Sequence, residues 1–231
     1  MSEKARCTAK VQIFNLKFNN NAFETFKLKK LMYSKQIIAI IILMTLSFTS
    51  ANAGKSEKIT LGAGCFWCVE AVFQRVNGVL KVESGYSGGA IANPTYMEVT
   101  SGLTGHAEVI QLTFDPEKVS LAKILEIFWK THDPTTLNRQ GADVGTQYRS
   151  AIFFHNENQR IVAEQLKAQL NQAQIWDKPI VTEITAFKAF YKAEDYHQNY
   201  YNENSNQSYC QFVIVPKLKK FEQLFQDYKT K

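Results

Sequence analysis

Apolar and polar residues alternate with two different periods along residues 54–231, and the period separates expected strands from expected helices. Strand-like runs cover residues 58–61, 79–83, 109–114, 151–154, 180–186 and 209–216. Apolar residues spaced three and four apart predict helices over 66–76, 121–129, 156–173 and 217–229, with a short helical turn over 93–99. Neither an internal repeat nor a linker separates these elements, so we expect a single domain.

The first 53 residues follow a different pattern. Residues 37–48 form a mostly apolar run of twelve, which Ala51-Asn52-Ala53 follows and which Lys27, Lys29, Lys30 and Lys35 precede. This order of charged, apolar and small residues is typical of a secretory signal peptide. An uncleaved membrane anchor is the alternative, but a membrane span needs roughly 20 apolar residues. We therefore expect a leader over residues 1–53, cleavage after Ala53, and an exported protein, periplasmic or secreted.

Residues 1–31 are polar, rich in Asn and Lys, and without a sustained period. A start codon assigned too far upstream of Met32 explains them, and so does an unusually long charged region before the apolar run. Cys7 lies in this segment and is expected to be absent from the mature protein.

Charge follows the same division of the chain. The whole sequence carries a formal net charge of +6, and residues 1–53 hold eight Lys and Arg against two Asp and Glu. Residues 54–231 hold nineteen of each sign, so the basic balance belongs to the leader. It gives no reason to expect nucleic-acid binding. The mature length is sufficient for one domain with its own core.

The strongest candidates for catalytic residues lie in one stretch, Gly62-Ala63-Gly64-Cys65-Phe66-Trp67-Cys68-Val69-Glu70. Cys65 lies where a predicted strand ends and a predicted helix begins. Unpaired N–H groups and the positive end of the helix dipole favour a thiolate there. We interpret Cys65 as a nucleophile.

Three other uses of these cysteines are weaker. A buried inert cysteine would not need two glycines and adjacent aromatics. Half of a zinc site is present, but no second Cys pair or His cluster completes it. Haem attachment requires His after Cys68, where Val69 stands. The mature chain keeps Cys65, Cys68 and Cys210, and an odd count in an exported chain indicates redox-active thiols.

Other polar and aromatic stretches remain open between two interpretations. Glu108 stands at the start of a mostly apolar strand. It is either a solvated residue at the strand end or a carboxyl held in a partly dry site. The glycine-rich run 84–89 is expected to be a turn. Residues 135–150 are a long polar loop, which suggests function, with Asp143 and Tyr148 as candidates and ordinary surface polarity as the alternative. The tyrosines of 191–209 are expected to pack a surface segment rather than to stack on a ligand.

Six short motifs, read together, resemble those of the A-type peptide methionine sulfoxide reductases, in that family's order. They are Gly-Cys-Phe-Trp-Cys (64–68), Gly-Tyr-Ser-Gly-Gly (85–89), Asn-Pro-Thr-Tyr (93–96), Gly-His-Ala-Glu (105–108), His-Asp-Pro (132–134) and Gly-Thr-Gln-Tyr-Arg-Ser (145–150). One motif alone would be weak, whereas the ordered set is highly specific. The resemblance runs from residue 58 to about 220.

The resemblance implies an α+β fold, a two-layer sandwich with a ferredoxin-like βαβ core in a single domain over residues 54–231. It also implies reduction of the S epimer of methionine sulfoxide, free or in proteins, back to methionine. The matching site residues are Cys65 as nucleophile, Glu108 as acid, Tyr96 and Tyr148 at the sulfoxide oxygen, Asp143 on the polar side, and Phe66 and Trp67 around the substrate methyl.

The chemistry of these residue types agrees with that reaction. A sulfoxide sulfur is weakly electrophilic, which suits attack by a soft thiolate such as Cys65. The departing oxygen needs a proton, and burial beside aromatic rings keeps a carboxyl such as Glu108 neutral near pH 7. Tyrosine hydroxyls stabilise the developing charge without titrating. No metal or organic cofactor is required, and we expect none.

Oxygen transfer leaves Cys65 as a sulfenic acid, which a second thiol converts to a disulfide. Cys210 matches the C-terminal recycling cysteine of part of the family and is the expected resolving thiol. Cys68 is the alternative, and a relay through all three thiols stays open. Expected partners are oxidised proteins, free methionine sulfoxide and a thioredoxin-like reductant of unknown identity. We expect a monomer that repairs oxidised proteins.

Two rival functions also use these residues. A thiol–disulfide oxidoreductase built on Cys65 and Cys68 would tolerate loss of Glu108. A non-catalytic exported module that binds methionine or aromatic ligands would keep its free thiols when given methionine sulfoxide.

The leader pattern makes a direct prediction about processing. Expressed with its full sequence in a host that exports it, the protein should lose residues 1–53 and begin at Gly54, because the small residues before that bond fit a signal-peptidase site. N-terminal sequencing of the exported form measures this. A chain that keeps residues 37–48 and stays with the membrane would instead support the anchor.

Overall fold

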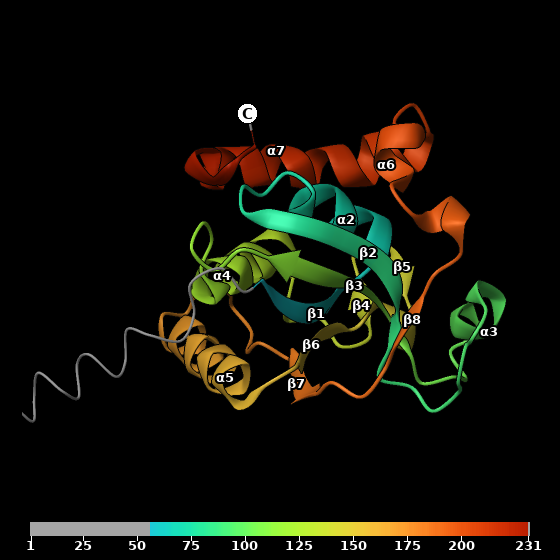
Figure 1. Ribbon diagram of the computed structural model, residues 1–231, viewed down its shortest axis with the longest axis horizontal. Helices are drawn as coiled ribbons and strands as arrows, with labels where there is room; N and C mark the ends of the chain where they lie inside the picture. Colours follow the sequence, from blue (N-terminus) through green and yellow to red (C-terminus); the bar gives the residue numbers. More distant parts are fainter. Residues whose placement is uncertain (1–55, 231) are drawn as a thin grey trace, which may run out of the picture. The chain divides into compact units, whose positions relative to one another are not determined.

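Two sheets organise the structure, a computed structural model that describes residues 56–230 (Figure 1). The larger contains β1 (Glu57–Ala63), β2 (Val79–Ser87), β3 (Ala107–Phe114), β6 (Ser150–Phe154), β7 (Glu183–Ala186) and β8 (Phe190–Lys192). Its order is β7–β6–β1–β3–β2–β8, and every neighbouring pair is antiparallel except β6 and β7. The smaller is a hairpin of β4 (Arg139–Gln140) and β5 (Asp143–Val144). The fold is therefore a mixed sheet with helices, an α+β domain.

The predicted leader, its cleavage site after Ala53 and Cys7 lie outside the described residues. Within residues 56–230, no helix combines the length and the apolar character needed to cross a membrane.

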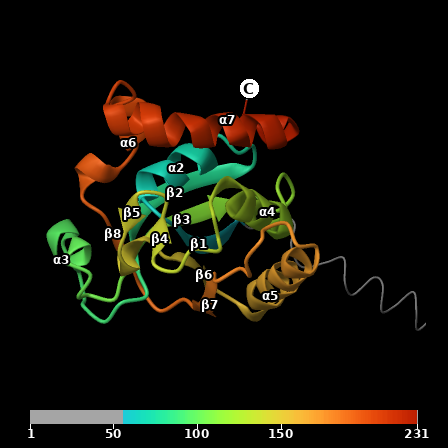
Figure 2. The same cartoon turned by 180° about the vertical axis from the view of Figure 1, so that it is seen from behind.

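Within residues 56–230, six α-helices connect and cover the strands. They are α2 (Phe66–Phe73), α3 (Tyr96–Thr100), α4 (Leu121–Thr131), α5 (Glu157–Gln172), α6 (Tyr200–Glu203) and α7 (Val215–Leu224). Single turns of 3₁₀-helix, η1 (Thr146–Tyr148), η2 (Asp195–His197) and η4 (Gln226–Tyr228), and a π-helix, η3 (Cys210–Ile214), complete the chain. Helix α2 contacts β2 and β3 on one side and α7 on the other, so it lies between the sheet and α7 (Figures 1 and 2).

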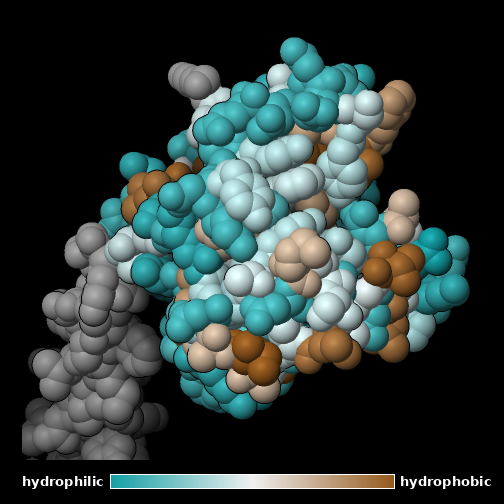
Figure 3. Space-filling model, turned by 90° about the vertical axis from the view of Figure 1, so that its right-hand side faces the viewer, coloured by the Kyte–Doolittle hydropathy of each residue, from teal (hydrophilic) through white to brown (hydrophobic). Residues whose placement is uncertain are grey.

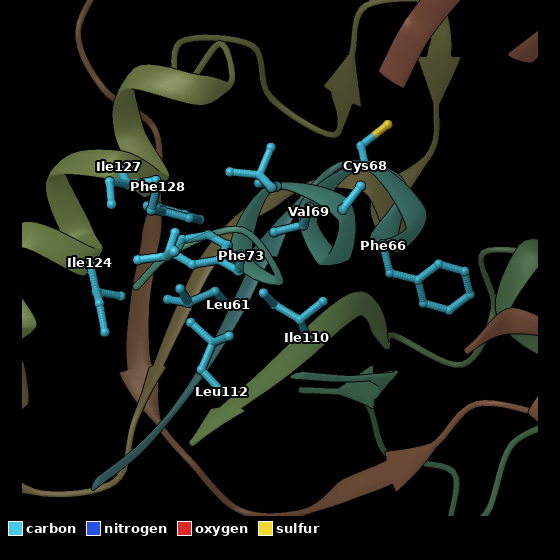
Figure 4. Packing of buried hydrophobic residues seen from close by; sticks show 14 of the residues in the cluster. Leu61, Phe66, Cys68, Val69, Phe73, Ile110, Leu112, Ile124, Ile127 and Phe128 are labelled. Atoms are coloured by element: carbon cyan, nitrogen blue, oxygen red, sulfur yellow. The ribbon is translucent and has the colours of Figure 1, made fainter. Parts of the chain in front are cut away.

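The main core fills the space between the sheet and α2, α4 and α7. Leu61 of β1 pairs with Ile110 of β3, and both are fully buried with Phe73 of α2 and Phe128 of α4 (Figure 4). The opposite face of the sheet carries a smaller apolar cluster of Ala107, Val109, Ala151 and Phe153. Alternate residues of β3 thus serve the two faces, as the period of two predicts.

Most predicted elements are confirmed with shifts at their ends. Ser120 and Asn156 cap α4 and α5, each accepting a hydrogen bond from a backbone N–H of the first turn. Thr95 caps α3 and forms a capping box with Glu98. Strand β2 continues through Ser87, so only the end of the run 84–89 is a turn.

The strand predicted over 209–216 is wrong, because the segment is the π-helix η3 followed by α7. Three successive β-branched residues at 213–215 favour a strand by propensity. A helical stripe overrides that preference by burying an apolar residue once per turn in the main core. The stripe consists of Cys210, Ile214, Leu218, Phe221 and Phe225. The loop predicted over 135–150 is also more ordered than expected, since it contains the β4–β5 hairpin and η1.

Candidate active site

Cys65 is the N-cap residue of α2, directly after β1. Gly64 before it has φ of +86°, and a Cβ there would lie 2.6 Å from the side chain of Gln140. Only glycine fits this turn without strain and without a clash. Cys65 itself is 7% exposed, so the strand and turn bring a nearly buried thiol to the start of the helix.

Glu108 lies beside that thiol and is 1% exposed, so the interpretation as a solvated strand end is wrong. The backbone N–H of Phe66 donates a hydrogen bond of 3.1 Å to Glu108 Oε2. Burial raises the pKa of Glu108 to about 8, although the Phe66 N–H opposes the rise. The carboxyl is therefore mainly protonated at pH 7 and can donate a proton.

The pKa of Cys65 shifts in the opposite direction from the sequence expectation. Burial raises it well above its usual value, and Cys68 and the charge of Glu108 add to the rise. The first N–H of α2 does not favour a thiolate here because it is already donated to Glu108. By contrast, the pKa of Cys68 is lowered to about 7, chiefly because Cys65 donates a hydrogen bond to it. Of the two thiols, Cys68 is therefore the more acidic.

Tyr96 and Tyr148 reach the same centre from different segments. Tyr96 begins α3 and Tyr148 ends η1, and both side chains are half-buried. Burial, followed by the charge of Glu108, raises the pKa of Tyr96 to about 12 and raises that of Tyr148 further. Charges at Cys65 and Asp143 also act on both. These hydroxyls therefore remain neutral donors at any pH near 7.

Asp143 of β5 is linked to the cysteines through Tyr209. The Tyr209 hydroxyl donates to Asp143 Oδ2 at 2.8 Å and lies 3.7 Å from Cys68 Sγ. Burial raises the pKa of Tyr209, so it acts as a neutral donor too. Tyr209 was not a candidate in the sequence analysis, because its segment was expected only to pack the surface.

Aromatic rings surround Phe66 and Trp67. The Trp67 ring stacks on Tyr200 at 3.7 Å between centroids, and its indole N–H donates to His197 Nδ1 at 3.1 Å. Buried Phe66 contacts the His197 ring at 5.0 Å and the Tyr86 ring at 5.9 Å. Since Nδ1 of His197 accepts, Nε2 carries the proton of the neutral imidazole.

Glu194 links strand β2 to helix α3. It accepts hydrogen bonds from the Tyr86 hydroxyl at 2.9 Å and from the Tyr96 backbone N–H at 2.8 Å. Sequence reasoning missed Glu194 and His197, although the signal was present. Their segment combines a high density of aromatic residues with a single histidine. Packing is indeed its main role, but the packing is against Trp67 and Tyr96.

All seven predicted site residues therefore lie within one centre, and the three cysteines near it are free thiols. Cys210 begins η3 and is fully buried, and the charge of Cys68 contributes to raising its pKa after burial itself. Within residues 56–230, no group of three or more His, Cys, Asp or Glu side chains is arranged to hold a metal ion. The arrangement offers a nucleophilic thiol, a proton donor beside it and neutral hydroxyls around them.

Comparison with known proteins gives one consistent family. Residues 57–229 match the family model described as peptide methionine sulfoxide reductase. The chain is 54% identical over 171 residues to peptide methionine sulfoxide reductase MsrA of Trichodesmium erythraeum, covering 74% of this chain and 97% of that protein. It is 55% identical over 171 residues to the protein of that name in Saccharolobus solfataricus, covering 74% and 96%.

Solved structures agree. Reduced Mxr1 from Saccharomyces cerevisiae superposes with a TM-score of 0.63 at 33% identity, covering 70% of this chain and 92% of that one. Methionine sulfoxide reductase A of Corynebacterium diphtheriae gives a TM-score of 0.59 at 35% identity, covering 67% and 77%.

The raised pKa of Glu108 makes the free energy of unfolding depend on pH. The folded protein holds this proton up to about pH 8, whereas an unfolded chain releases it near 4.5. The stability that the neutral carboxyl contributes is fully present below pH 4.5 and is lost as the pH rises to about 8. The loss is at most about 1.4 kcal/mol per pH unit. Glu108→Gln keeps the shape and the acceptor for Phe66 but cannot ionise, so it should remove this loss.

Urea unfolding between about pH 5 and 8 measures the effect. The free energy of unfolding of Glu108→Gln minus that of the wild type should increase with pH. Glu117→Gln, at an exposed carboxyl, should give a difference that does not change. A constant difference for Glu108→Gln would show that Glu108 ionises normally.

Proposed function

The chain belongs to the peptide methionine sulfoxide reductase family and is an oxidoreductase, and we propose that it reduces the S epimer of methionine sulfoxide, free and in proteins, in the repair of oxidised proteins. The observation that carries this proposal is the protonated carboxyl of Glu108 beside the Cys65 thiol. A thiol that only exchanges disulfides does not need an acid with a pKa of about 8 next to it.

The first step transfers oxygen to Cys65. Its sulfur attacks the sulfoxide sulfur, and the oxygen ends on Cys65 as a sulfenic acid while methionine leaves. The substrate sulfur gains two electrons and the Cys65 sulfur loses two. Cys68, which accepts the hydrogen bond of the Cys65 thiol, takes the proton of that thiol. Glu108 protonates the oxygen as it leaves the substrate, and Tyr96 and Tyr148 donate hydrogen bonds to it.

Selection of one epimer follows from placing apolar and polar groups on opposite sides. Phe66 and Trp67 supply the apolar side, which accepts the substrate methyl. Tyr96, Tyr148 and Asp143 supply the polar side, which accepts the oxygen. With both groups fixed, only one hand at the sulfur presents its remaining face to Cys65.

The surface next to the site supports the proposal that oxidised proteins are substrates. Figure 3 shows the side of the molecule on which α3 lies, where apolar residues are scattered over a polar face. Met97 follows Tyr96 and is 75% exposed, and Val144 follows Asp143 and is 64% exposed. An extended peptide that carries the oxidised methionine can contact such residues without the enzyme opening.

Cys68 is the better candidate than Cys210 to resolve the sulfenic acid. It lies one helical turn from Cys65, accepts its hydrogen bond and has a pKa of about 7. Cys68 first releases the proton that it took from Cys65. Its thiolate then attacks Cys65, forms the Cys65–Cys68 disulfide and displaces hydroxide, which takes up that proton to become water. Cys210, buried at the start of η3, remains for a later exchange with Cys68. This choice reverses the preference that the sequence suggested.

A thioredoxin-like reductant would return the disulfide to two thiols. If the protein is exported, as the leader pattern predicts, these electrons must be delivered across the membrane. The strand order β6–β1–β3–β2, with α2 after β1 and α4 after β3, supports a ferredoxin-like βαβ core as part of the same proposal.

Single-turnover reduction tests the proposed function. The fully reduced mature protein, mixed with methionine S-sulfoxide, should form methionine and lose two thiols for each methionine. Cys65→Ser should form none. Glu108→Gln should form methionine about 10²- to 10⁴-fold more slowly, because the oxygen then leaves without an acid. Exchange with a small disulfide should persist in Glu108→Gln. Failure of the wild type to form one equivalent of methionine would refute the proposal.

The role of each remaining thiol is separable in the same assay. Cys68→Ser should form one equivalent of methionine and keep a sulfenic acid that dimedone traps, because Cys65 then has no neighbouring thiolate. Cys210→Ser should still form the Cys65–Cys68 disulfide, which mass spectrometry identifies. A lasting sulfenic acid in Cys210→Ser, and none in Cys68→Ser, would restore Cys210 as the resolving thiol.

A further inference from the structure

A small cavity lies next to Cys68, and Glu108 is not among the residues that line it. Its volume is about 10 Å³, close to the least that holds one water molecule. Helices α2, α4 and α7 supply most of its lining, which is Ala63, Cys68, Val69, Val72, Phe128, Thr131, His132 and Lys217. Figure 4 shows Cys68 pointing away from the packed side chains of Phe73 and Leu61.

Lys217 is the cation of this cavity. It is half-buried in α7, whereas Lys219 and Lys220 of the same helix are exposed. Within the described part of the chain, Lys217 forms no ion pair with a carboxylate. A half-buried ammonium group that shares a cavity with a thiol and has no acidic partner is well placed to stabilise the thiolate.

The other groups around Cys68 do not supply that positive charge. His132 donates and accepts through both ring nitrogens, with the Phe128 carbonyl and the Ser150 hydroxyl, and burial lowers its pKa to about 3. It is therefore neutral. Tyr209 offers a hydroxyl, and Asp143 brings a negative charge that raises the pKa of Cys68. Glu108 is neutral near pH 7, and Cys210 is a buried thiol.

The need for Lys217 increases during the reaction. In the resting enzyme the largest cause that lowers the pKa of Cys68 is the hydrogen bond from the Cys65 thiol, and the charge of Lys217 comes after it among the lowering causes. In the proposed first step, Cys65 gives its proton to Cys68 and becomes a sulfenic acid. The thiol hydrogen bond is then gone, and Cys68 must lose a proton before it can attack. Lys217 remains as the charge that favours this loss.

We propose that Lys217 is a positioning residue for the second half of the reaction, which holds Cys68 as a thiolate through their shared cavity and so speeds conversion of the Cys65 sulfenic acid into a disulfide. The inference rests on the proposed function. The step balances: the Cys68 thiolate forms the S–S bond, the S–O bond of the sulfenic acid breaks, and hydroxide leaves and is protonated to water. Lys217 takes no part in the proton transfer and touches no substrate atom.

Three variants test this inference. Lys217→Met removes the charge with little change of volume, Lys217→Arg keeps it, and Lys219→Met removes an exposed charge from the same helix as a control. Single turnover with methionine S-sulfoxide at pH 7 measures methionine formation and, separately, loss of dimedone-trapped sulfenic acid. Alkylation of Cys68 by iodoacetamide as a function of pH, followed by tandem mass spectrometry, measures ionisation without any turnover.

The expected result is a loss that depends on pH. Lys217→Met should form the disulfide about fivefold more slowly at pH 7, because loss of a nearby positive charge raises the pKa of Cys68 by about one unit. Methionine formation, in which Cys68 accepts the proton of Cys65, should slow by no more than the same factor at pH 7 and recover at the same high pH. The defect should disappear near pH 9, and Lys217→Arg and Lys219→Met should behave as the wild type. The pH midpoint of Cys68 alkylation should rise only in Lys217→Met.

Two outcomes would overturn the inference. One is an alkylation midpoint and a disulfide rate in Lys217→Met that equal those of the wild type. The other is an equal slowing of both steps at every pH, which indicates a structural role. If the wild type itself forms no methionine, the proposed function fails, and the alkylation profiles still decide whether Lys217 acts on Cys68.

Discussion

The hydrogen bond from the Phe66 N–H to Glu108 governs the chemistry of the site. The first N–H of a helix normally favours an anion at its N-cap, and here that anion would be the Cys65 thiolate. Glu108 occupies the donor instead, at 3.1 Å. Burial raises the pKa of its carboxyl to about 8 even though the Phe66 N–H lowers it. One backbone donor thus holds the carboxyl of Glu108 at the start of α2, next to Cys65, where a thiolate would otherwise accept that N–H.

Helix α2 also gathers the distant segment that encloses this centre. Glu70 accepts a hydrogen bond from the Asn199 N–H at 3.0 Å, and Trp67 stacks on Tyr200. Both contacts bridge about 130 positions in the sequence. They bring His197 and Tyr209 against the aromatic and cysteine side chains of α2. The helix that Cys65 caps is therefore also the surface on which the C-terminal part of the site is assembled.

Sequence reasoning reached the parts of the site whose signals are local. Gly64 and Cys65 lie between a strand pattern and a helix pattern, and Glu108 lies in an alternating strand, so periodicity located both. It failed for Tyr209 and His197, because their roles depend on contacts with α2 that no local pattern contains. It also gave the wrong direction for the pKa of Cys65, because burial, followed by the neighbouring Cys68, raises that pKa. The π-helix was missed because its β-branched residues favour a strand by propensity, and only burial of the helical stripe in the main core overrides that preference.

The join of η3 and α7 has a mechanical consequence. The two form one uninterrupted helical rod from Cys210 to Leu224, with Tyr209 immediately before its first turn. Because the helical axis is continuous, displacing Cys210 toward Cys68 would also displace Tyr209, whose hydroxyl donates to Asp143, and Lys217, which lines the cavity beside Cys68. A disulfide between Cys210 and Cys68 would therefore act at once on both of these neighbours of Cys68.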